Sequence, residues 1–88
     1  MEAYLLKPSI RIAVQDNASV ILDPERGEYY SLGAVATAIC LALRDHCTLT
    51  DVLSQIENRF ETAGRDPMKD LKFFLERLIQ LQLCIRVA

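Results

Sequence analysis

Residues 21–33, ILDPERGEYYSLG, mark the point where the period of the apolar pattern changes. Before Gly33 apolar residues recur at every second position, which is typical of strands with one buried face. Pro24 presets the first dihedral angle of a turn and Gly27 accepts a positive φ, so the segment predicts a hairpin. The return strand of this hairpin is Glu28–Leu32, EYYSL. After Gly33 the apolar spacing becomes helical, so the sequence predicts strands first and helices afterwards.

Two further strands are predicted upstream of the turn. Residues 10–14, IRIAV, place an apolar residue at every position of one face. Asp16 and Asn17 then favour a turn, and residues 19–23, SVILD, form the next strand. Together with Glu28–Leu32, these runs predict three antiparallel strands.

Three helices are predicted downstream. Residues 34–43 contain a single polar residue, which is typical of the central helix of a small core. The second helix begins near Thr48, whose hydroxyl is a suitable N-cap. The third begins at Asp66 and Pro67, a cap followed by a proline in the first turn, and extends to about Gln82.

The remaining segments complete one domain that spans residues 1–88. Residues 61–65 are predicted as a loop, and residues 83–87 as a last short strand. The order is then three antiparallel strands followed by three helices. We expect an α+β fold, since this is the composition of a winged helix-turn-helix.

Composition excludes several classes of protein. The chain has 88 residues, of which 51% are hydrophobic and 25% charged, values typical of a globular domain. Ten lysines and arginines against twelve acidic residues give a net charge of −2, which argues against a nucleic-acid partner. The start of the sequence lacks the pattern of a secretory signal, and the longest apolar run is about half a membrane span. We therefore expect a cytoplasmic protein with no membrane partner.

The residues most often used for chemistry are sparse. Cys40, Cys47 and Cys84 are an odd number without a CxxC pair, so they predict no disulfide framework, and the apolar surroundings of Cys40 and Cys84 indicate buried positions. His46 is the only histidine. Adjacent loop residues such as His46 and Cys47 rarely hold nucleophile and base geometry, and adding Cys84 does not give metal-ligand spacing. We expect no catalytic residue, no metal and no cofactor.

The predicted third helix carries one aromatic residue on the wrong face. At 100° per residue, Leu71, Leu75 and Leu78 form the centre of a buried face. Phe73 falls nearly opposite, beside Arg77, where a large apolar side chain needs a partner or a cover. Two interpretations remain open: the hairpin or a second copy covers Phe73, or Phe73 lines a groove for a ligand.

The strand EYYSL carries a second indication of binding. It contains neither proline nor lysine, the residues that often protect an exposed sheet edge. If it lies at the edge, its free backbone groups can accept an added peptide strand; if it lies inside the sheet, they cannot. Of the adjacent Tyr29 and Tyr30, we expect at least one to pack in the core.

Three runs of the sequence resemble a known family. They are ILDPERGEYYSLGAVATAIC (21–40), LTDVLSQIENRF (49–60) and DLKFFLERLIQLQLCI (70–85). In order and spacing they are similar to the PqqD-like family of leader-peptide-recognition domains, also called RiPP recognition elements. The matching residues are Asp23, Gly27, Tyr30, Leu32, Ile39, Phe60, Asp70, Leu71, Phe74, Leu75, Leu78, Leu83 and Ile85.

Four positions depart from the family pattern. Gly33 stands where the family often has asparagine, Ala36 where it often has glycine, and Cys40 where it often has tryptophan. Gln82 replaces the glycine that often precedes the last strand, so we expect a less defined end for the third helix. None of these differences removes the fold that the resemblance implies.

The resemblance implies a non-catalytic protein that binds the leader of a ribosomally made precursor peptide. The leader of such a precursor pairs antiparallel with the third strand and packs against the third helix. In this sequence the implied peptide-binding residues are Glu28, Tyr29, Tyr30, Ser31 and Leu32 on the strand, and Lys69, Asp70, Phe73, Phe74 and Arg77 on the helix. Phe73 would be an apolar anchor, Lys69 and Arg77 partners for acidic leader residues, and Asp70 a partner for a basic one.

Within that family, a free-standing chain of this length most resembles the leader-binding protein of lasso-peptide pathways. That protein delivers the precursor to a separate cysteine protease, which removes the leader. The second possibility is the peptide chaperone of pyrroloquinoline-quinone biosynthesis, which presents its peptide to another modifying enzyme.

Two other functions are compatible with the expected fold. A DNA-binding winged helix is disfavoured because basic and acidic residues alternate along residues 65–77 and the chain is acidic overall. A self-associating module is the other, since an exposed Phe73 would suit a homodimer. Both remain as alternatives to peptide binding.

Overall fold

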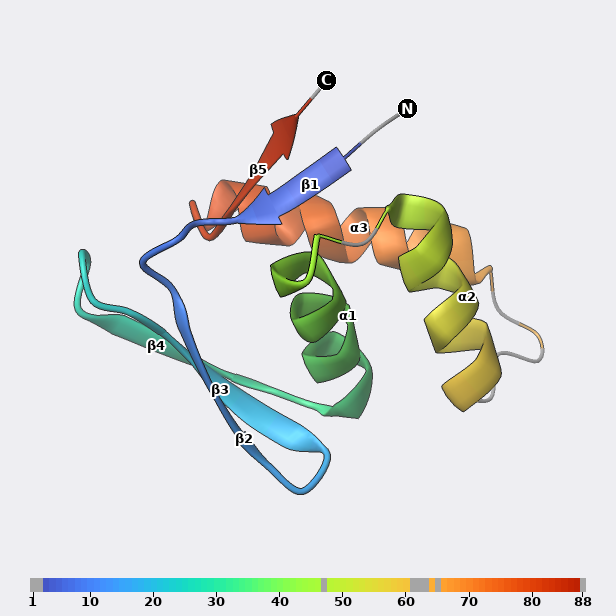
Figure 1. Cartoon of the computed structure of the whole chain (residues 1–88), viewed down its shortest axis with the longest axis horizontal. Helices are drawn as coiled ribbons and strands as arrows, with labels where there is room; N and C mark the ends of the chain where they lie inside the picture. Colours follow the sequence, from blue (N-terminus) through green and yellow to red (C-terminus); the bar gives the residue numbers. More distant parts are fainter. Residues whose placement is uncertain (1–2, 47, 61–63, 65, 88) are drawn as a thin grey trace.

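A computed structural model of the chain describes residues 3–46, 48–60, 64 and 66–87. The elements in chain order are β1 (Ala3–Leu6), β2 (Arg11–Gln15), β3 (Ala18–Asp23), β4 (Glu28–Leu32), α1 (Ala34–Arg44), α2 (Leu49–Arg59), α3 (Pro67–Gln80) and β5 (Cys84–Val87) (Figure 1). The expectation of an α+β protein with antiparallel strands and three helices is confirmed.

The strands form two separate antiparallel sheets. β2, β3 and β4 make a three-stranded sheet with β3 in the centre, and β1 pairs with β5 in a two-stranded ribbon. In the three-stranded sheet, Ile21 lies opposite both Ile12 and Tyr30. The side chain of Ile21 is fully buried, whereas Leu22 and its partner Tyr29 are exposed on the other face. One face of the sheet therefore covers the core, and the other faces solvent.

The turn between β3 and β4 is held by a buried carboxylate. The side chain of Asp23 accepts a hydrogen bond from the backbone N–H of Glu25 at 3.1 Å, which closes an Asx-type turn. Its second oxygen lies 3.4 Å from Nζ of Lys7, just after β1. Gly27 has φ = 67°, as the sequence predicted for this turn. This arrangement fixes where β4 begins.

The central helix of the core is α1. Six of its eleven residues are buried, and it contacts β1, β3, β4 and α2. Thr37 is its buried polar residue, and its hydroxyl lies 2.8 Å from that of Ser19 on β3, so each group has a hydrogen-bonding partner. The prediction that residues 34–43 form the central helix is confirmed.

The starts of α2 and α3 follow the capping residues. The Thr48 side chain accepts a hydrogen bond from the Asp51 N–H, and the Asp66 side chain accepts one from the Lys69 N–H, each at 3.2 Å. Pro67 occupies the first turn of α3. The buried face of α3 consists of Leu71, Leu75 and Leu78, as the periodicity predicted.

The end of α3 is sharply defined, contrary to the expectation that rested on Gln82. The helix ends at Gln80, two residues earlier than predicted. The N–H of Gln82 bonds the carbonyl of Ile79, and the N–H of Leu83 bonds that of Leu78, each at 2.9 Å. Gln82 itself has φ = 61°. This is the hydrogen-bond pattern of a Schellman motif, with glutamine in the left-handed position where glycine is usual.

The prediction of three strands before the helices is wrong, because β1 precedes them as a fourth. The residues of β1 alternate only weakly, and its partner β5 lies at the other end of the chain, with Ala3 opposite Val87. A local pattern does not report such a pairing. The last strand, expected at 83–87, is confirmed as β5. The winged helix-turn-helix designation stays a prediction.

Three sequence predictions fall wholly or partly outside the described residues. They concern Cys47, Arg65 and all of the 61–65 loop except Gly64. Across residues 3–46, 48–60, 64 and 66–87, no helix combines the length and the apolar character needed to cross a bilayer.

Candidate functional site

The edge strand β4 is the first part of the candidate site. It pairs with β3 from the Glu28–Asp23 pair to the Leu32–Ser19 pair, and no other strand among the described residues pairs with its outer side. In an antiparallel ladder, alternate residues of an edge strand direct their N–H and C=O groups outward. Within the described part of the chain, the backbone groups along the outer edge of β4 are therefore unpaired.

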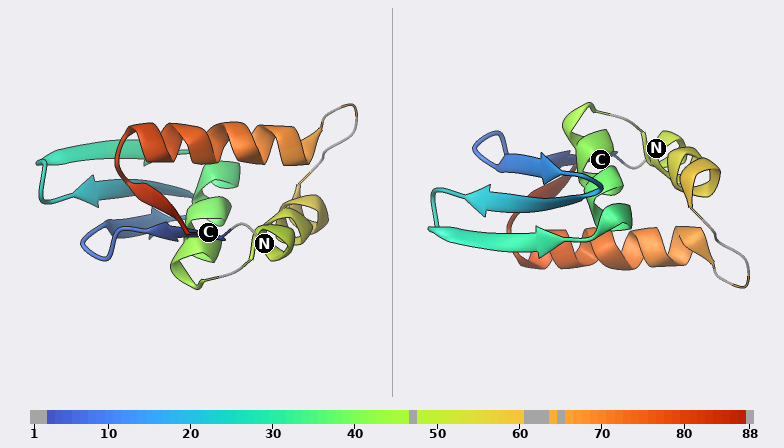
Figure 2. Two further views of the ribbon diagram at one scale, coloured as in Figure 1. Left: turned by 90° about the horizontal axis from the view of Figure 1, so that it is seen from above. Right: turned by 90° about the horizontal axis from the view of Figure 1, so that it is seen from below.

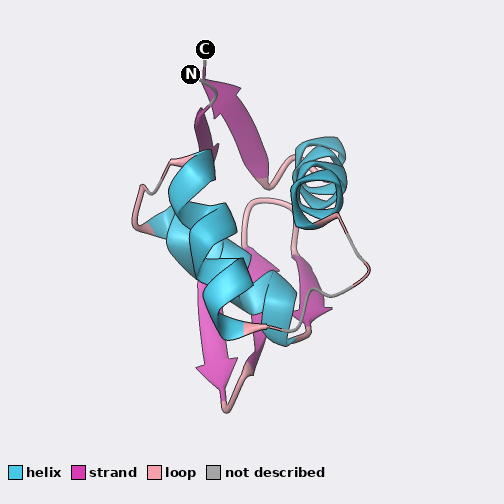
Figure 3. Ribbon diagram, turned by 90° about the vertical axis from the view of Figure 1, so that its right-hand side faces the viewer, coloured by secondary structure: helices cyan, strands magenta, loops and turns pink. Residues whose placement is uncertain are grey.

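Helix α3 runs beside this edge in the opposite direction to β4. At the start of β4, the Arg26 guanidinium donates to the carbonyl of Leu81 at 3.3 Å, just after the C-terminal end of α3. At the other end, Val35 follows β4 closely and lines a pocket together with Asp70, near the N-terminal end of α3. Both views in Figure 2 place α3 and β4 along the same side of the molecule, and Figure 3 shows α3 almost end-on.

The aromatic residue that the sequence placed on the wrong face of α3 is exposed. The side chain of Phe73 is 73% exposed, and neither the hairpin nor any other described element covers it. The adjacent Phe74 is only half-buried and packs against the core. Of the two interpretations, cover by the hairpin is wrong. Lining of a ligand groove and contact with a second copy both stay as predictions.

A pocket of about 630 Å³ lies where the N-terminal ends of α1 and α3 approach α2. Its apolar lining residues are Val35, Ala36, Ile39, Ile56, Pro67, Leu71 and Phe74, and its polar ones are Asp66, Lys69 and Asp70. Because the apolar residues form most of the lining and the charged residues are exposed, the pocket suits an apolar side chain flanked by polar groups.

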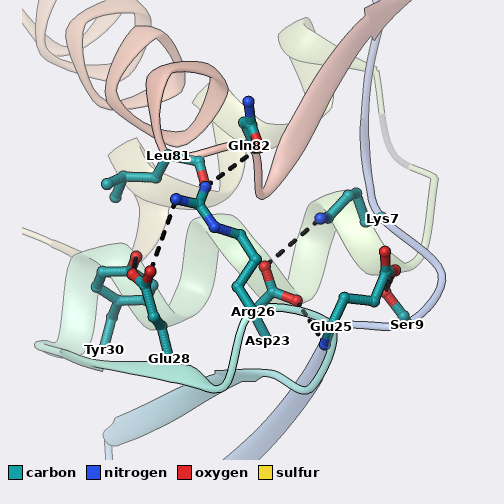
Figure 4. Close-up of polar contacts among 9 residues, drawn as sticks. All are labelled: Lys7, Ser9, Asp23, Glu25, Arg26, Glu28, Tyr30, Leu81 and Gln82. Atoms are coloured by element: carbon teal, nitrogen blue, oxygen red, sulfur yellow. Dashed lines mark hydrogen bonds and ion pairs between the residues drawn. The ribbon is translucent and has the colours of Figure 1, made fainter.

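The start of β4 is held by a small polar cluster (Figure 4). Arg26 lies 3.6 Å from the carboxylate of Glu28, so its charge is matched locally. The hydroxyl of Tyr30 donates to the second carboxylate oxygen of Glu28. This hydrogen bond raises the pKa of Tyr30, so the hydroxyl remains a donor. The cluster orients Glu28 and Tyr30 along the strand.

The structure brings most of the predicted site residues to one side of the molecule. Tyr30 and Leu32 of β4 pack partly against the core, while Tyr29 and Ser31 are exposed on the opposite face. The expectation that at least one of Tyr29 and Tyr30 contacts the core is thus confirmed by Tyr30. On α3, the exposed predicted residues are Lys69, Asp70, Phe73 and Arg77.

Sequence reasoning missed two contributions to the site. Val35, Ala36 and Ile39 of α1 line the pocket, although the pattern marked this helix only as core. Arg26 connects the β3–β4 turn to the end of α3. The position of Val35 in the first turn of the helix that follows the edge strand was a usable signal, whereas the contact of Arg26 across 55 positions was not.

The remaining reactive residues that the structure describes are buried or lie away from this surface. Burial raises the pKa of Cys40 to about 12 and that of Cys84 to about 11, so both thiols stay protonated at neutral pH. His46 is exposed in the loop after α1. Among the described residues, no three His, Cys, Asp or Glu side chains come together as metal ligands.

The fold and the sequence together define a family. The family model described as "Coenzyme PQQ synthesis protein D (PqqD)" matches residues 18–83. The chain belongs to this family, which confirms the resemblance found in the sequence.

Solved structures give a more detailed comparison. "Lasso peptide synthetase B1 complexed with the leader peptide" is 27% identical, with a TM-score of 0.79 over 93% of this chain and 96% of that one. "TbiB1 in Complex with the TbiA(beta) Leader Peptide" is 23% identical, with a TM-score of 0.79 over 91% of this chain and 93% of that one, so it is similar in fold.

A third structure has the same fold inside a much longer chain. "Structure of the heterocyclase TruD" matches 100% of this chain but only 12% of its own length, at 18% identity and a TM-score of 0.69. No protein with a curated description matches the sequence.

Proposed function

We propose that this protein is non-catalytic and captures the leader segment of a ribosomally made precursor peptide by strand addition to β4. The observation that carries the proposal is the outer edge of Glu28–Leu32, which no other described strand pairs, beside a helix that exposes Phe73. An extended peptide can satisfy the backbone groups of such an edge while its alternate side chains contact the neighbouring helix. Membership of the PqqD family and the two leader-bound similar structures support the proposal.

An antiparallel leader would run from the pocket towards the β3–β4 turn. Its N-terminal part would lie near Val35 and Asp70, where the 630 Å³ pocket accepts an apolar side chain. Its middle would lie opposite Phe73, which acts as the apolar anchor. Lys69, Asp70 and Arg77 would contribute exposed charge contacts, which are individually weak and sensitive to salt.

The binding of an extended peptide must overcome its loss of conformational freedom. A preformed edge strand reduces this cost, because only the guest has to be ordered. Presentation by a bound carrier also raises the effective concentration of the peptide at a partner enzyme. We propose a leader-removing cysteine protease as that enzyme and a lasso-peptide pathway as the setting, supported by the 27% identical lasso peptide synthetase B1. A cytoplasmic location is part of this proposal.

The second candidate function is the peptide chaperone of pyrroloquinoline-quinone biosynthesis. It is favoured by the description of the matching family model, which names a protein of coenzyme PQQ synthesis. Both functions would use the same edge strand and therefore share the binding mode. They differ in the peptide that is bound and in the enzyme partner.

The test is a titration of fluorescently labelled leader peptides from both kinds of pathway, followed by anisotropy. Saturable binding of one peptide should be accompanied by slower hydrogen exchange at alternate amides of β4, because these amides become bonded to the guest. The matched control is the same peptide N-methylated at alternate positions, which cannot complete the ladder and should bind at least tenfold more weakly, since roughly two lost backbone hydrogen bonds cost that much. Binding that leaves β4 exchange unchanged would contradict strand addition.

A further inference from the structure

Opposite charges lie on the two sides of the exposed Phe73 along α3. Asp70, Phe73 and Arg77 are three and four residues apart, so they share one face of the helix. All three are exposed. The ion pairs formed within the described part of the chain are Lys7–Asp23 and Arg26–Glu28, and neither Asp70 nor Arg77 takes part in them.

The two charges lie at opposite ends of β4. Asp70 shares the pocket with Val35, which follows the C-terminal end of the strand. Arg77 lies one turn before Leu81, whose carbonyl is bonded by Arg26 just ahead of the strand. The charge of Arg26 is matched by Glu28 at 3.6 Å, whereas Arg77 has no ion-pair partner among the described residues and is available at this end.

Neighbouring charges do not cancel the negative charge of Asp70 at one end of β4 or the positive charge of Arg77 at the other. At the pocket, Lys69 is accompanied by two carboxylates, Asp66 and Asp70. The positive end of the α3 dipole would by itself favour an acidic peptide residue at this end, but the Asp66 carboxylate already caps it by accepting a hydrogen bond from the Lys69 N–H. The acidic side chain nearest in sequence to Arg77, Glu76, is turned 100° away around the helix.

We propose that the peptide bound at this site carries a basic residue, then an apolar residue, then an acidic residue, in that order along its chain. The proposal rests on the proposed function, since it assumes antiparallel addition to β4. A guest antiparallel to β4 runs in the same direction as α3, so its earlier residues meet Asp70 and its later residues meet Arg77. Recognition thus depends on the order of the charges as well as on the apolar anchor.

The spacing follows from the geometry of helix and strand. Seven residues of helix separate Asp70 from Arg77 by about 10.5 Å along the axis. Side chains of an added strand that face the helix recur at i, i+2 and i+4, and the outer two are about 13 Å apart. Long charged side chains can span the difference between these two distances. The recognised pattern is therefore basic-x-apolar-x-acidic, with the apolar residue over Phe73.

Two labelled peptides of identical composition test this order. One carries Lys-Thr-Phe-Thr-Glu between identical flanking residues, and the other carries Glu-Thr-Phe-Thr-Lys. The lysine-first peptide should bind about fivefold more tightly at low ionic strength, the size expected of two exposed charge pairs. The ratio should approach one at about 1 M salt, where the screening length is about 3 Å.

Charge exchange in the protein supplies the second measurement. Asp70→Lys combined with Arg77→Glu should make the glutamate-first peptide the tighter binder, because both charge contacts are reversed. The matched control is Lys72→Glu combined with Glu76→Lys, which exchanges charges on exposed residues of the other side of α3 and should leave the preference unchanged.

The possible results distinguish a failure of the charge order from a failure of the proposed function. Equal binding of the two peptides with slowed exchange at β4 would overturn the charge order and leave strand addition in place. A preference for the glutamate-first peptide by the unaltered protein would overturn it as well. Loss of binding by every peptide, leader peptides included, would remove the proposed function itself.

Discussion

The guanidinium of Arg26 donates a hydrogen bond to the side-chain oxygen of Gln82 at 3.2 Å, although 56 positions separate the two residues in the chain (Figure 4). The same guanidinium bonds the carbonyl of Leu81 at 3.3 Å and lies near Glu28. The start of the edge strand is thereby connected to the end of α3. This contact sets the separation of the two walls of the candidate site at one end.

The left-handed conformation of Gln82 predicts an unusual order of substitution effects. Gln82 has φ = 61°, which costs a side-chain-bearing residue about 1 kcal/mol, and most for a β-branched one. Gln82→Gly should keep or raise the free energy of unfolding, because relief of the backbone offsets the lost contact with Arg26. Gln82→Ala should lower it by about 0.5–1.5 kcal/mol through that lost hydrogen bond. Gln82→Val should lower it further.

Urea unfolding of these three variants measures the order directly. The free energy of unfolding of each variant is compared with that of the unaltered protein, with one common slope of free energy against urea concentration. A valine variant as stable as the unaltered protein would contradict the left-handed conformation of residue 82.

The hydroxyl pair between β3 and α1 predicts strong coupling between two substitutions. Ser19 and Thr37 are both buried, and their oxygens lie 2.8 Å apart. Ser19→Ala or Thr37→Val alone leaves one buried hydroxyl unpaired and should cost about 1–3 kcal/mol. The double substitution removes both polar groups, so its cost should be clearly smaller than the sum of the two single costs. A double-mutant cycle from urea unfolding checks this, and additive costs would show that the bond contributes nothing.

The buried thiols predict a loss of stability in alkaline solution. Burial raises the pKa of Cys40 from 9.0 to about 12 and that of Cys84 from 9.0 to about 11. Below pH 9 the thiols keep their protons in both the folded and the unfolded protein. Above pH 9 the unfolded chain releases these protons first. The free energy of unfolding therefore falls as the pH rises towards 11. Each thiol should contribute about 1 kcal/mol per pH unit to this fall.

Replacement of Cys40 measures how much this thiol contributes to the fall of the free energy of unfolding with rising pH. Cys40→Ala should be less stable than the parent at pH 8, and the difference should shrink between pH 9 and pH 10.5. Cys47, which lies outside the described residues, is replaced by serine in both proteins so that it adds no titration. A stability difference that stays constant with pH would show that the Cys40 thiol titrates normally.

The parts of this fold that the sequence predicted depend on local chemistry. The caps at Thr48 and Asp66 act within one helical turn, and the turn after Asp23 is complete within five residues, so their residue types are sufficient to find them. The position of Phe73 opposite the buried face of α3 followed from helical periodicity alone, whereas its exposure needed the structure, because the sequence left cover by the hairpin open.

The parts that were missed depend on contacts between distant segments. β1 exists because Ala3–Leu6 finds a partner at the other end of the chain. The pocket requires α1 and α3 to approach each other. The left-handed backbone of Gln82 is accompanied by a hydrogen bond to its side chain from Arg26, which lies in the β3–β4 turn. None of these pairings leaves a periodic signal in its own segment.

Two alanine substitutions on α3 distinguish its proposed binding face from its buried face. Phe73 is 73% exposed, so Phe73→Ala removes no core contact and should leave the free energy of unfolding nearly unchanged. If Phe73 anchors the leader, the same substitution should weaken peptide binding by about 1–3 kcal/mol, or roughly 5- to 150-fold in Kd. Leu75 is fully buried, so Leu75→Ala should instead cost about 2–5 kcal/mol of folding stability.

Anisotropy titration and urea unfolding of both variants give the required pair of measurements. The combination that supports the site is a folded Phe73→Ala protein with weak peptide binding beside a destabilised Leu75→Ala protein. Normal peptide binding by Phe73→Ala would exclude the anchor role. Sedimentation of the unaltered protein completes the test: a dimer that becomes a monomer on Phe73→Ala substitution would assign the exposed ring to self-association, because the second copy would then cover the surface that the peptide needs.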